Sequence, residues 1–232
     1  MTTETSQVTA VKVERKAATP AAGAVAGLLF AVLYSASMII FMNTMAQIES
    51  GTGPSLESSL PAFDLSLGLI PFAGLFFLWF VAVARQRLGR FEDQFFATIF
   101  MGSGYIFLGL TFVAAALAGA SLANAHQDPA FAGSSTYDFA RLAVAQLLTI
   151  FIPKMLGVFM LSQSVLWLTT RVMPRWMALV ALLVAFSLLL GLGQPPWNVL
   201  IFPAWVALVS IYILVNHLRT PASTQPVARQ AI

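Results

Sequence analysis

The sequence predicts an all-α membrane protein that crosses the bilayer six times and keeps both termini in the cytoplasm. Hydrophobic residues make up 59% of the 232 residues and charged residues only 9%, whereas soluble domains carry about 25% charged residues. Several uncharged apolar segments exceed the roughly 20 residues that a membrane helix needs. Ten of the twelve Lys and Arg residues lie where an odd-numbered segment begins or an even-numbered one ends, and such positive charge marks the cytoplasmic side.

The N-terminal residues 1–20 predict a disordered cytoplasmic tail, because they carry Lys12, Arg15 and Lys16 and show no periodic apolar pattern. An uncharged run then extends from Ala17 almost to Glu49. It is much longer than the roughly 7 to 15 apolar residues of a signal peptide. We therefore expect an uncleaved first span at about 21–46, with a cleaved signal peptide as the competing interpretation.

The second span is expected at about 65–84 and the third at about 94–120. The stretch RQRLGR between them, residues 85–90, is strongly basic and predicts a cytoplasmic turn. Glu92 and Asp93 come directly after it. Acidic residues stabilise the first turn of a helix through its dipole, so we interpret both as helix caps.

The last three spans are expected at about 139–169, 176–191 and 198–217. No charged residue occurs from Trp176 to Leu218, a run too long for one span, and the cluster GLGQPPW at 191–197 predicts the break. Residues 219–232 are polar and predict a second disordered cytoplasmic tail. Residues 21–218 then form a single transmembrane domain.

Each even-numbered span contains one interior proline, at Pro71, Pro153 or Pro203, and no odd-numbered span does. This regularity suggests three helical hairpins in series. A proline inside a helix frees the carbonyl four residues earlier, and loosened backbone of this kind binds ions in some transporters. Ordinary kinks without a binding role are the simpler alternative.

The fourth predicted span holds the polar residues that could form a site. Lys154 is a lone charge expected in mid-membrane, and no Asp or Glu lies inside any span to pair with it. Gln146, Thr149 and Gln163 are the neighbouring candidates for ligand binding. Two roles for Lys154 stay open. In the first it donates to the carbonyls of Thr149 and Ile150, which Pro153 loosens, and to Gln or Ser neighbours; in the second it faces a cavity and binds an anionic or carbonyl-bearing ligand.

No motif indicates an enzyme, a cofactor or a metal site. The chain has no cysteine, and its two histidines, His126 and His217, are expected at opposite membrane faces. Neither HExxH nor a phosphate-binding glycine loop occurs. The basic residues lie at segment ends, which indicates topology signals and lipid headgroup contacts, and nucleic acid is not an expected partner.

Two stretches resemble a family of uncharacterised bacterial multi-span membrane proteins. They are GLIPFAGLFFLWFVAVARQRLGRFEDQFFATIFMGSGYIFLGL at 68–110 and KMLGVFMLSQSVLWLTTRVMPRWMALV at 154–180. The resemblance implies a bacterial plasma-membrane protein of about six helices and supplies no activity or site residue.

Two functions are therefore expected. The first is a non-enzymatic structural or regulatory partner in the membrane, packed solid, with the lipid bilayer and other membrane proteins as its contacts and with an oligomeric state that the sequence does not define. The alternative is a small transporter of an anionic or polar solute or lipid, with a hydrated cavity that Lys154 reaches.

Overall fold

The computed structural model describes residues 19–50, 56–88, 94–191 and 196–219, and these ranges are helical without any strand. The elements are α2 (Pro20–Ser50), α3 (Leu56–Leu88), α4 (Gln94–Gln127), η1 (Phe131–Gly133), α5 (Ser135–Gln146), η2 (Leu147–Phe151), α6 (Ile152–Thr170), α7 (Arg175–Leu190), η3 (Pro196–Leu200) and α8 (Ile201–Arg219). Apart from their innermost residues, the two predicted tails, 1–20 and 219–232, lie outside the described residues.

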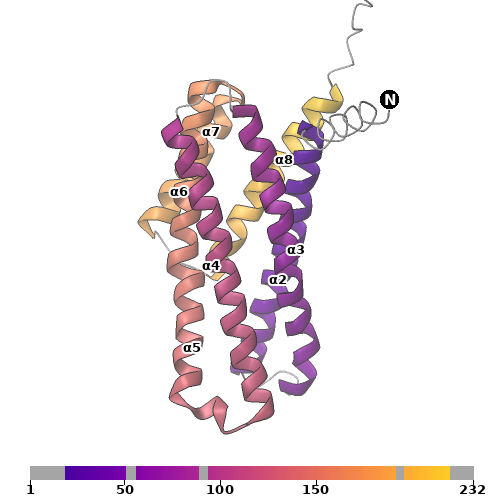
Figure 1. Cartoon of the computed structure of the whole chain (residues 1–232), viewed down its shortest axis with the longest axis vertical. Coiled ribbons are helices and arrows are strands. Elements are labelled where there is room, and N and C mark those ends of the chain that lie inside the picture. The colour runs from indigo at the N-terminus through magenta and orange to yellow at the C-terminus, as the bar shows by residue number, and fades with distance from the viewer. Residues whose placement is uncertain (1–18, 51–55, 89–93, 192–195, 220–232) are drawn as a thin grey trace, which may run out of the picture.

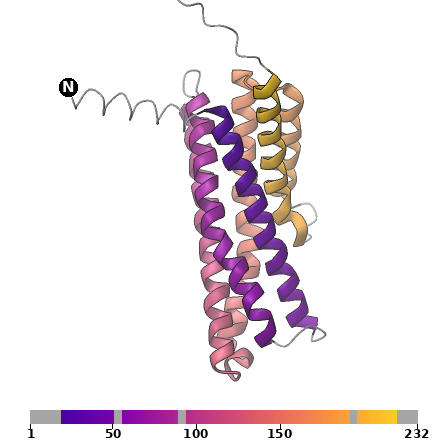
Figure 2. The same cartoon turned by 90° about the vertical axis from the view of Figure 1, so that its right-hand side faces the viewer.

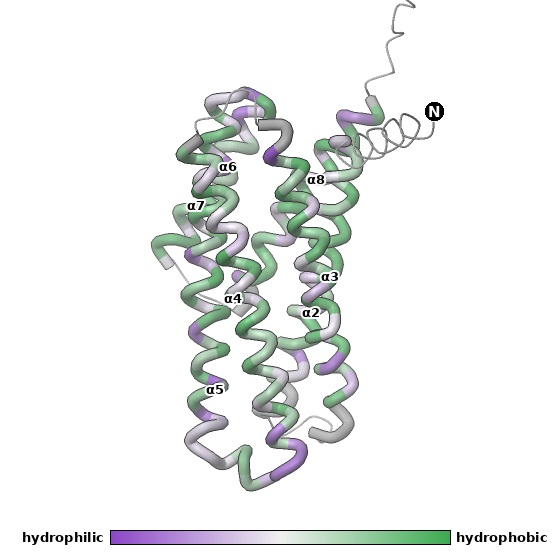
Figure 3. The backbone as a smooth tube through the Cα atoms, in the orientation of Figure 1, coloured by the Kyte–Doolittle hydropathy of each residue, from purple (hydrophilic) through white to green (hydrophobic). Residues whose placement is uncertain are grey.

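Five helical stretches are long and apolar enough to cross a membrane. They are Pro20–Ala46, Leu60–Arg85, Phe95–Gln127, Ser135–Thr170 and Asn198–Leu218. The predicted fifth span corresponds to α7, an apolar helix of only 16 residues. Hydrophobic residues dominate the length of the bundle in Figure 3, and hydrophilic ones gather toward its ends and along α5. A multi-pass, all-helical membrane protein is thus supported, while six crossings and their orientation stay predictions.

The helices run along one long axis, and four segments meet at one end of it (Figure 1). Pro20, Ala84, Met173 and His217 line one cavity, which brings the start of α2, the end of α3, the α6–α7 turn and the end of α8 together. We call this the basic end, because Arg85, Arg171 and Arg175 lie there; the opposite end is the far end. The described parts of both terminal helices and both predicted basic turns therefore share one end, as the sequence predicts.

The break between α7 and α8 lies where the sequence predicts it. Helix α7 ends at Leu190, and Gly191 adopts a left-handed conformation with φ 66°, which glycine accepts without steric cost. In two perpendicular views α7 and α8 extend from the basic end only part of the way along the bundle (Figure 2). The four long helical stretches continue beyond them.

The three interior prolines do not have equivalent environments. Pro153 follows η2, a π-helical segment in which the N–H of Ile152 donates to the carbonyl of Leu147. Such a widened turn accommodates a residue that lacks an N–H. Pro71 lies inside the uninterrupted helix α3. Pro203 lies in the first turn of α8, where a missing N–H costs no helical hydrogen bond. The backbone departs from regular α-helix just before Pro153, at η2, and just before Pro203, at the 3₁₀ segment η3. That each proline frees the carbonyl four residues earlier stays a prediction.

Five phenylalanines, one from each of five helices, meet at the centre of the bundle. They are Phe30 on α2, Phe77 on α3, Phe107 on α4, Phe159 on α6 and Phe202 on α8, all fully buried or nearly so. Their ring centroids lie 5.0 to 5.9 Å apart in tilted or edge-to-face pairs, the arrangement that aromatic quadrupoles favour. This phenylalanine cluster ties the helices together across the middle of the protein.

Candidate functional site

Lys154 lies within hydrogen-bond distance of a backbone carbonyl on a neighbouring helix, and not of the carbonyls that the sequence interpretation names. Its Nζ lies 3.5 Å from the carbonyl oxygen of Leu189, in the last turn of α7, and the side chain is exposed. The acceptor is not the carbonyl of Thr149 or Ile150. Those carbonyls were expected because side chains in a helix lean toward its N-terminus. A cation beside the C-terminal carbonyls of a helix is favoured by the helix dipole. The ammonium therefore acts as a weak cap on α7.

The position of Lys154 along the bundle can be compared with the mid-membrane depth expected from the sequence. The uncharged stretch of α3 between Asp64 and Arg85 corresponds to about 30 Å of helix, equal to the hydrocarbon thickness of a bilayer. Arg85 and Arg171 mark the same end, because Ala84 and Val172 line one cavity. Lys154 lies about 25 Å of helix rise from Arg171. If the uncharged stretch of α3 matches the bilayer, Lys154 lies nearer the far-end edge of the hydrocarbon region than its middle; its depth in a membrane stays a prediction.

The other three candidate residues lie in unrelated environments. Gln146 is exposed at the end of α5, and Thr149 is exposed within η2, where its Oγ1 donates to the carbonyl of Ala145 at 2.7 Å. Gln163 is only 3% exposed on α6, about 13 Å of helix rise from Lys154. The structure therefore does not gather Lys154, Thr149, Gln146 and Gln163 into one site.

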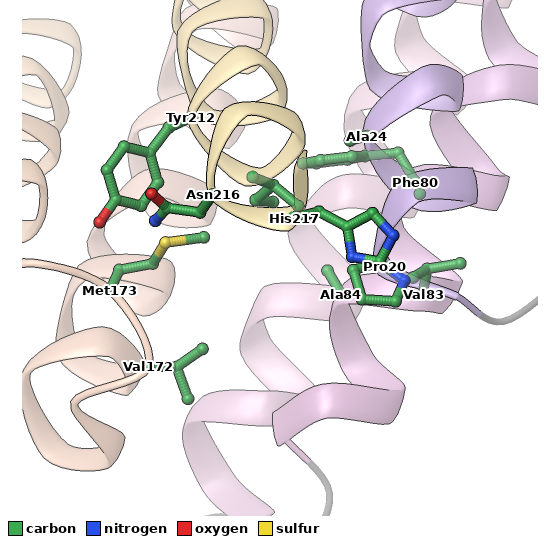
Figure 4. Close-up of a pocket in the computed structure, with 12 residues that line it drawn as sticks. Pro20, Ala24, Phe80, Val83, Ala84, Val172, Met173, Tyr212, Asn216 and His217 are labelled. Atoms are coloured by element: carbon green, nitrogen blue, oxygen red, sulfur yellow. The ribbon is translucent and has the colours of Figure 1, made fainter. Parts of the chain in front are cut away.

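A cavity of about 250 Å³ opens instead at the basic end (Figure 4). We call it the basic-end cavity; it is lined by Pro20, Gly23, Ala24, Phe80, Val83, Ala84, Val172, Met173, Tyr212, Ile213, Asn216 and His217. Its lining comes from α2, α3, α8 and the α6–α7 turn. No local pattern in the sequence marks it, because each of these segments contributes only a few residues and none carries a recognisable motif.

A recess of about 50 Å³ adjoins this cavity and shares Phe80, Ala84, Val172, Met173 and Ile213 with it. Its remaining lining is Phe100, Gln163, Trp167 and Val209. The indole N–H of Trp205 donates to Oε1 of Gln163 at 3.1 Å. This buried hydrogen bond joins α6 to α8 and leaves the amide NH₂ of Gln163 as the group that could donate to a water or ligand in the recess.

A second cavity, of about 170 Å³, lies at the far end among α2, α3, α4 and α5. Phe41, Met45, Leu122 and Tyr137 contribute to its largely apolar lining, and Arg141 also borders it. The phenylalanine cluster lies between this cavity and the basic-end cavity. Lys154 lines neither of them, nor the recess.

The described part of the chain brings together no group of three or more His, Asp or Glu residues that could hold a metal ion. No family model matches the chain, and neither a curated protein nor a solved structure matches it. The resemblance to bacterial multi-span membrane proteins therefore stays a prediction.

Replacing Lys154 with methionine is expected to change the free energy of unfolding in detergent by less than about 1 kcal/mol. The loss of a cation at a helix C-terminus costs roughly 0.3 to 1 kcal/mol. Removing a charge near the membrane edge relieves only a small free-energy cost of membrane insertion. Lys154→Arg keeps the cation and serves as the control. A gain of roughly 2.5 to 3.5 kcal/mol would instead indicate a charge in mid-membrane.

Proposed function

We propose that the protein is a non-enzymatic structural or regulatory partner in a bacterial plasma membrane, with six crossings and cytoplasmic termini. The observation that carries this proposal is the phenylalanine cluster. Five buried rings pack between the basic-end cavity and the far-end cavity. Polar side chains beside them, such as Tyr34 and Ser103, are themselves buried, and a centre packed in this way offers no open path for a solute. The lipid bilayer and other membrane proteins are then the partners of its helix faces.

The alternative, a transporter with an anion site at Lys154, has less support. The ammonium is within reach of the Leu189 carbonyl, and a solute would have to compete with that contact. None of the cavities at either end is lined by Lys154. A transporter also needs water to reach the centre of the bundle from each side in turn, and this requirement can be measured.

Single cysteines report where water reaches, because the natural chain contains none. Ser103 on α4 and Ser164 on α6 are buried, and cysteine is close to serine in size. We expect Ser103→Cys and Ser164→Cys to stay unreactive toward a small charged thiol reagent from either face. Gly133→Cys should react in intact cells, and His217→Cys only after the membrane is permeabilised.

Two outcomes would contradict the proposal, each in a different part. Reaction of Ser103→Cys or Ser164→Cys in sealed vesicles would indicate a hydrated centre and favour a transporter. Reaction of His217→Cys in intact cells, with Gly133→Cys protected, would reverse the orientation.

A further inference from the structure

The basic-end cavity combines an apolar interior with a polar mouth. Phe80, Val83 and Ile213 supply apolar walls, while Tyr212 and Asn216 present polar groups toward the same space as Met173 in Figure 4. The adjoining recess continues inward to Trp167 and Phe100. An occupant that matches this shape has one apolar chain and one polar head.

The charged residues at the basic end indicate which charge the polar head of the ligand carries. Arg85 directly follows the lining residue Ala84, and Arg171 directly precedes the lining residue Val172; both arginines are exposed. Within the described ranges, every Asp and Glu belongs to the far half of the bundle: Glu49, Glu57, Asp64, Asp128 and Asp138. Glu92 and Asp93, which follow the basic turn, lie outside the described residues, and the Arg residues of the two basic turns outnumber them. Such an excess of positive charge near the mouth attracts an anion.

The volume of the cavity limits the size of the apolar chain that a ligand can place in it. Its volume of about 250 Å³ lies just below the roughly 300 to 1,000 Å³ of pockets for drug-sized ligands. It is too small for a phospholipid with two chains. We propose that the basic-end cavity binds a single-chain anionic amphiphile of the fatty-acid class, with its carboxylate at the mouth beside Arg85 and Asn216 and its chain directed toward Trp167.

Tryptophan fluorescence can test this proposal, because Trp167 lines the recess and a bromine atom quenches tryptophan on contact. The purified full-length protein in nanodiscs of zwitterionic lipid is titrated with ω-bromododecanoic acid. We expect saturable quenching, reversal by unbrominated dodecanoic acid, and loss of most of the saturable part in Trp167→Phe. The neutral ω-bromododecanol should need an about tenfold higher concentration for the same quenching.

Two substitutions on one helix distinguish quenching by a ligand bound in the cavity from quenching by a ligand dissolved in the bilayer. Ala84 lines both the cavity and the recess, whereas Ala82 is exposed on α3 and lines neither. Ala84→Leu should weaken saturable quenching about tenfold, and Ala82→Leu should leave it unchanged. If Ala84→Leu does not fold, Val172→Phe fills the same space from the α6–α7 turn.

The binding proposal is overturned if the filling variant and Ala82→Leu are quenched alike, because the quencher then acts from the bilayer. Equal quenching by the acid and the alcohol would exclude a site that selects an anion. Neither result depends on whether the protein transports a solute, so the proposed function is tested separately.

Discussion

Replacing Phe77 with alanine is expected to lower the free energy of unfolding in detergent by about 3 kcal/mol. Phe77 is 0% exposed and contacts the rings of Phe30, Phe107, Phe159 and Phe202. The substitution leaves a cavity where four helices meet this one. Because an unfolded membrane protein keeps its apolar side chains in the micelle, lost packing rather than transfer to water supplies the cost. We therefore expect a loss at the lower end of the range that is usual when a buried phenylalanine is replaced by alanine.

Phe72→Ala is the matched control on the same helix. Phe72 is 61% exposed on α3, so its removal should change stability by less than about 1 kcal/mol. Thermal unfolding followed by near-ultraviolet circular dichroism measures both variants. Equal melting temperatures for the two would mean that the phenylalanine cluster is not the packed centre, and the argument against a transport path would lose its basis.

Charge distribution was sufficient to predict the ends of the helices on the basic side. Arg171 is the C-cap of α6, and Arg85 ends the apolar stretch of α3, although the helix continues to Leu88 into the predicted turn. The run from Trp176 to Leu218 is interrupted at Gly191 as expected. These features depend on neighbours in the sequence, because a helix end needs a local cap, a charge or a turn residue. They could therefore be predicted without tertiary information.

The depth of Lys154 could not be predicted in the same way. The predicted fourth span, 139–169, has Lys154 at its centre, which predicts a position in the middle of the membrane. The helical stretch Ser135–Thr170 has 36 residues, about 54 Å of rise, which greatly exceeds a bilayer of about 30 Å. When a helix is that long, its neighbours determine its depth, and the neighbours here are α7 and the uncharged stretch of α3.

The phenylalanine cluster and the basic-end cavity required the tertiary structure. The chain has 19 phenylalanines, and nothing in the sequence singles out the five that meet at the centre. The four segments that line the cavity are separated by long stretches of chain. Gln163 is an example: the sequence suggests it as a ligand residue on the same span as Lys154, whereas the structure pairs it with Trp205 beside the recess.

Replacing Gly27 with alanine is expected to destabilise the bundle by roughly 1 to 3 kcal/mol. A Cβ atom at this position would lie 2.8 Å from Cδ2 of Phe80 and closer still to Oγ of Ser210, so α2 would have to move away from α3 and α8. Small residues at helix contacts allow such close approach in membranes. The GAVAG sequence at 23–27 thus serves packing within the chain, with Gly23 against Val83.

Two comparisons isolate this steric effect in thermal unfolding measurements. Gly109→Ala on α4 meets no atom within 4 Å and should be neutral or stabilising by up to about 1 kcal/mol, because alanine favours helix. Ser210 is buried, and its Oγ has no hydrogen-bond partner among the described residues, so Ser210→Ala should cost little. In the double variant, Ser210→Ala should recover part of the loss caused by Gly27→Ala, since the closest clashing atom is gone. If Gly27→Ala and Gly109→Ala unfold at the same temperature, α2 does not pack against α8 as closely as the structure indicates.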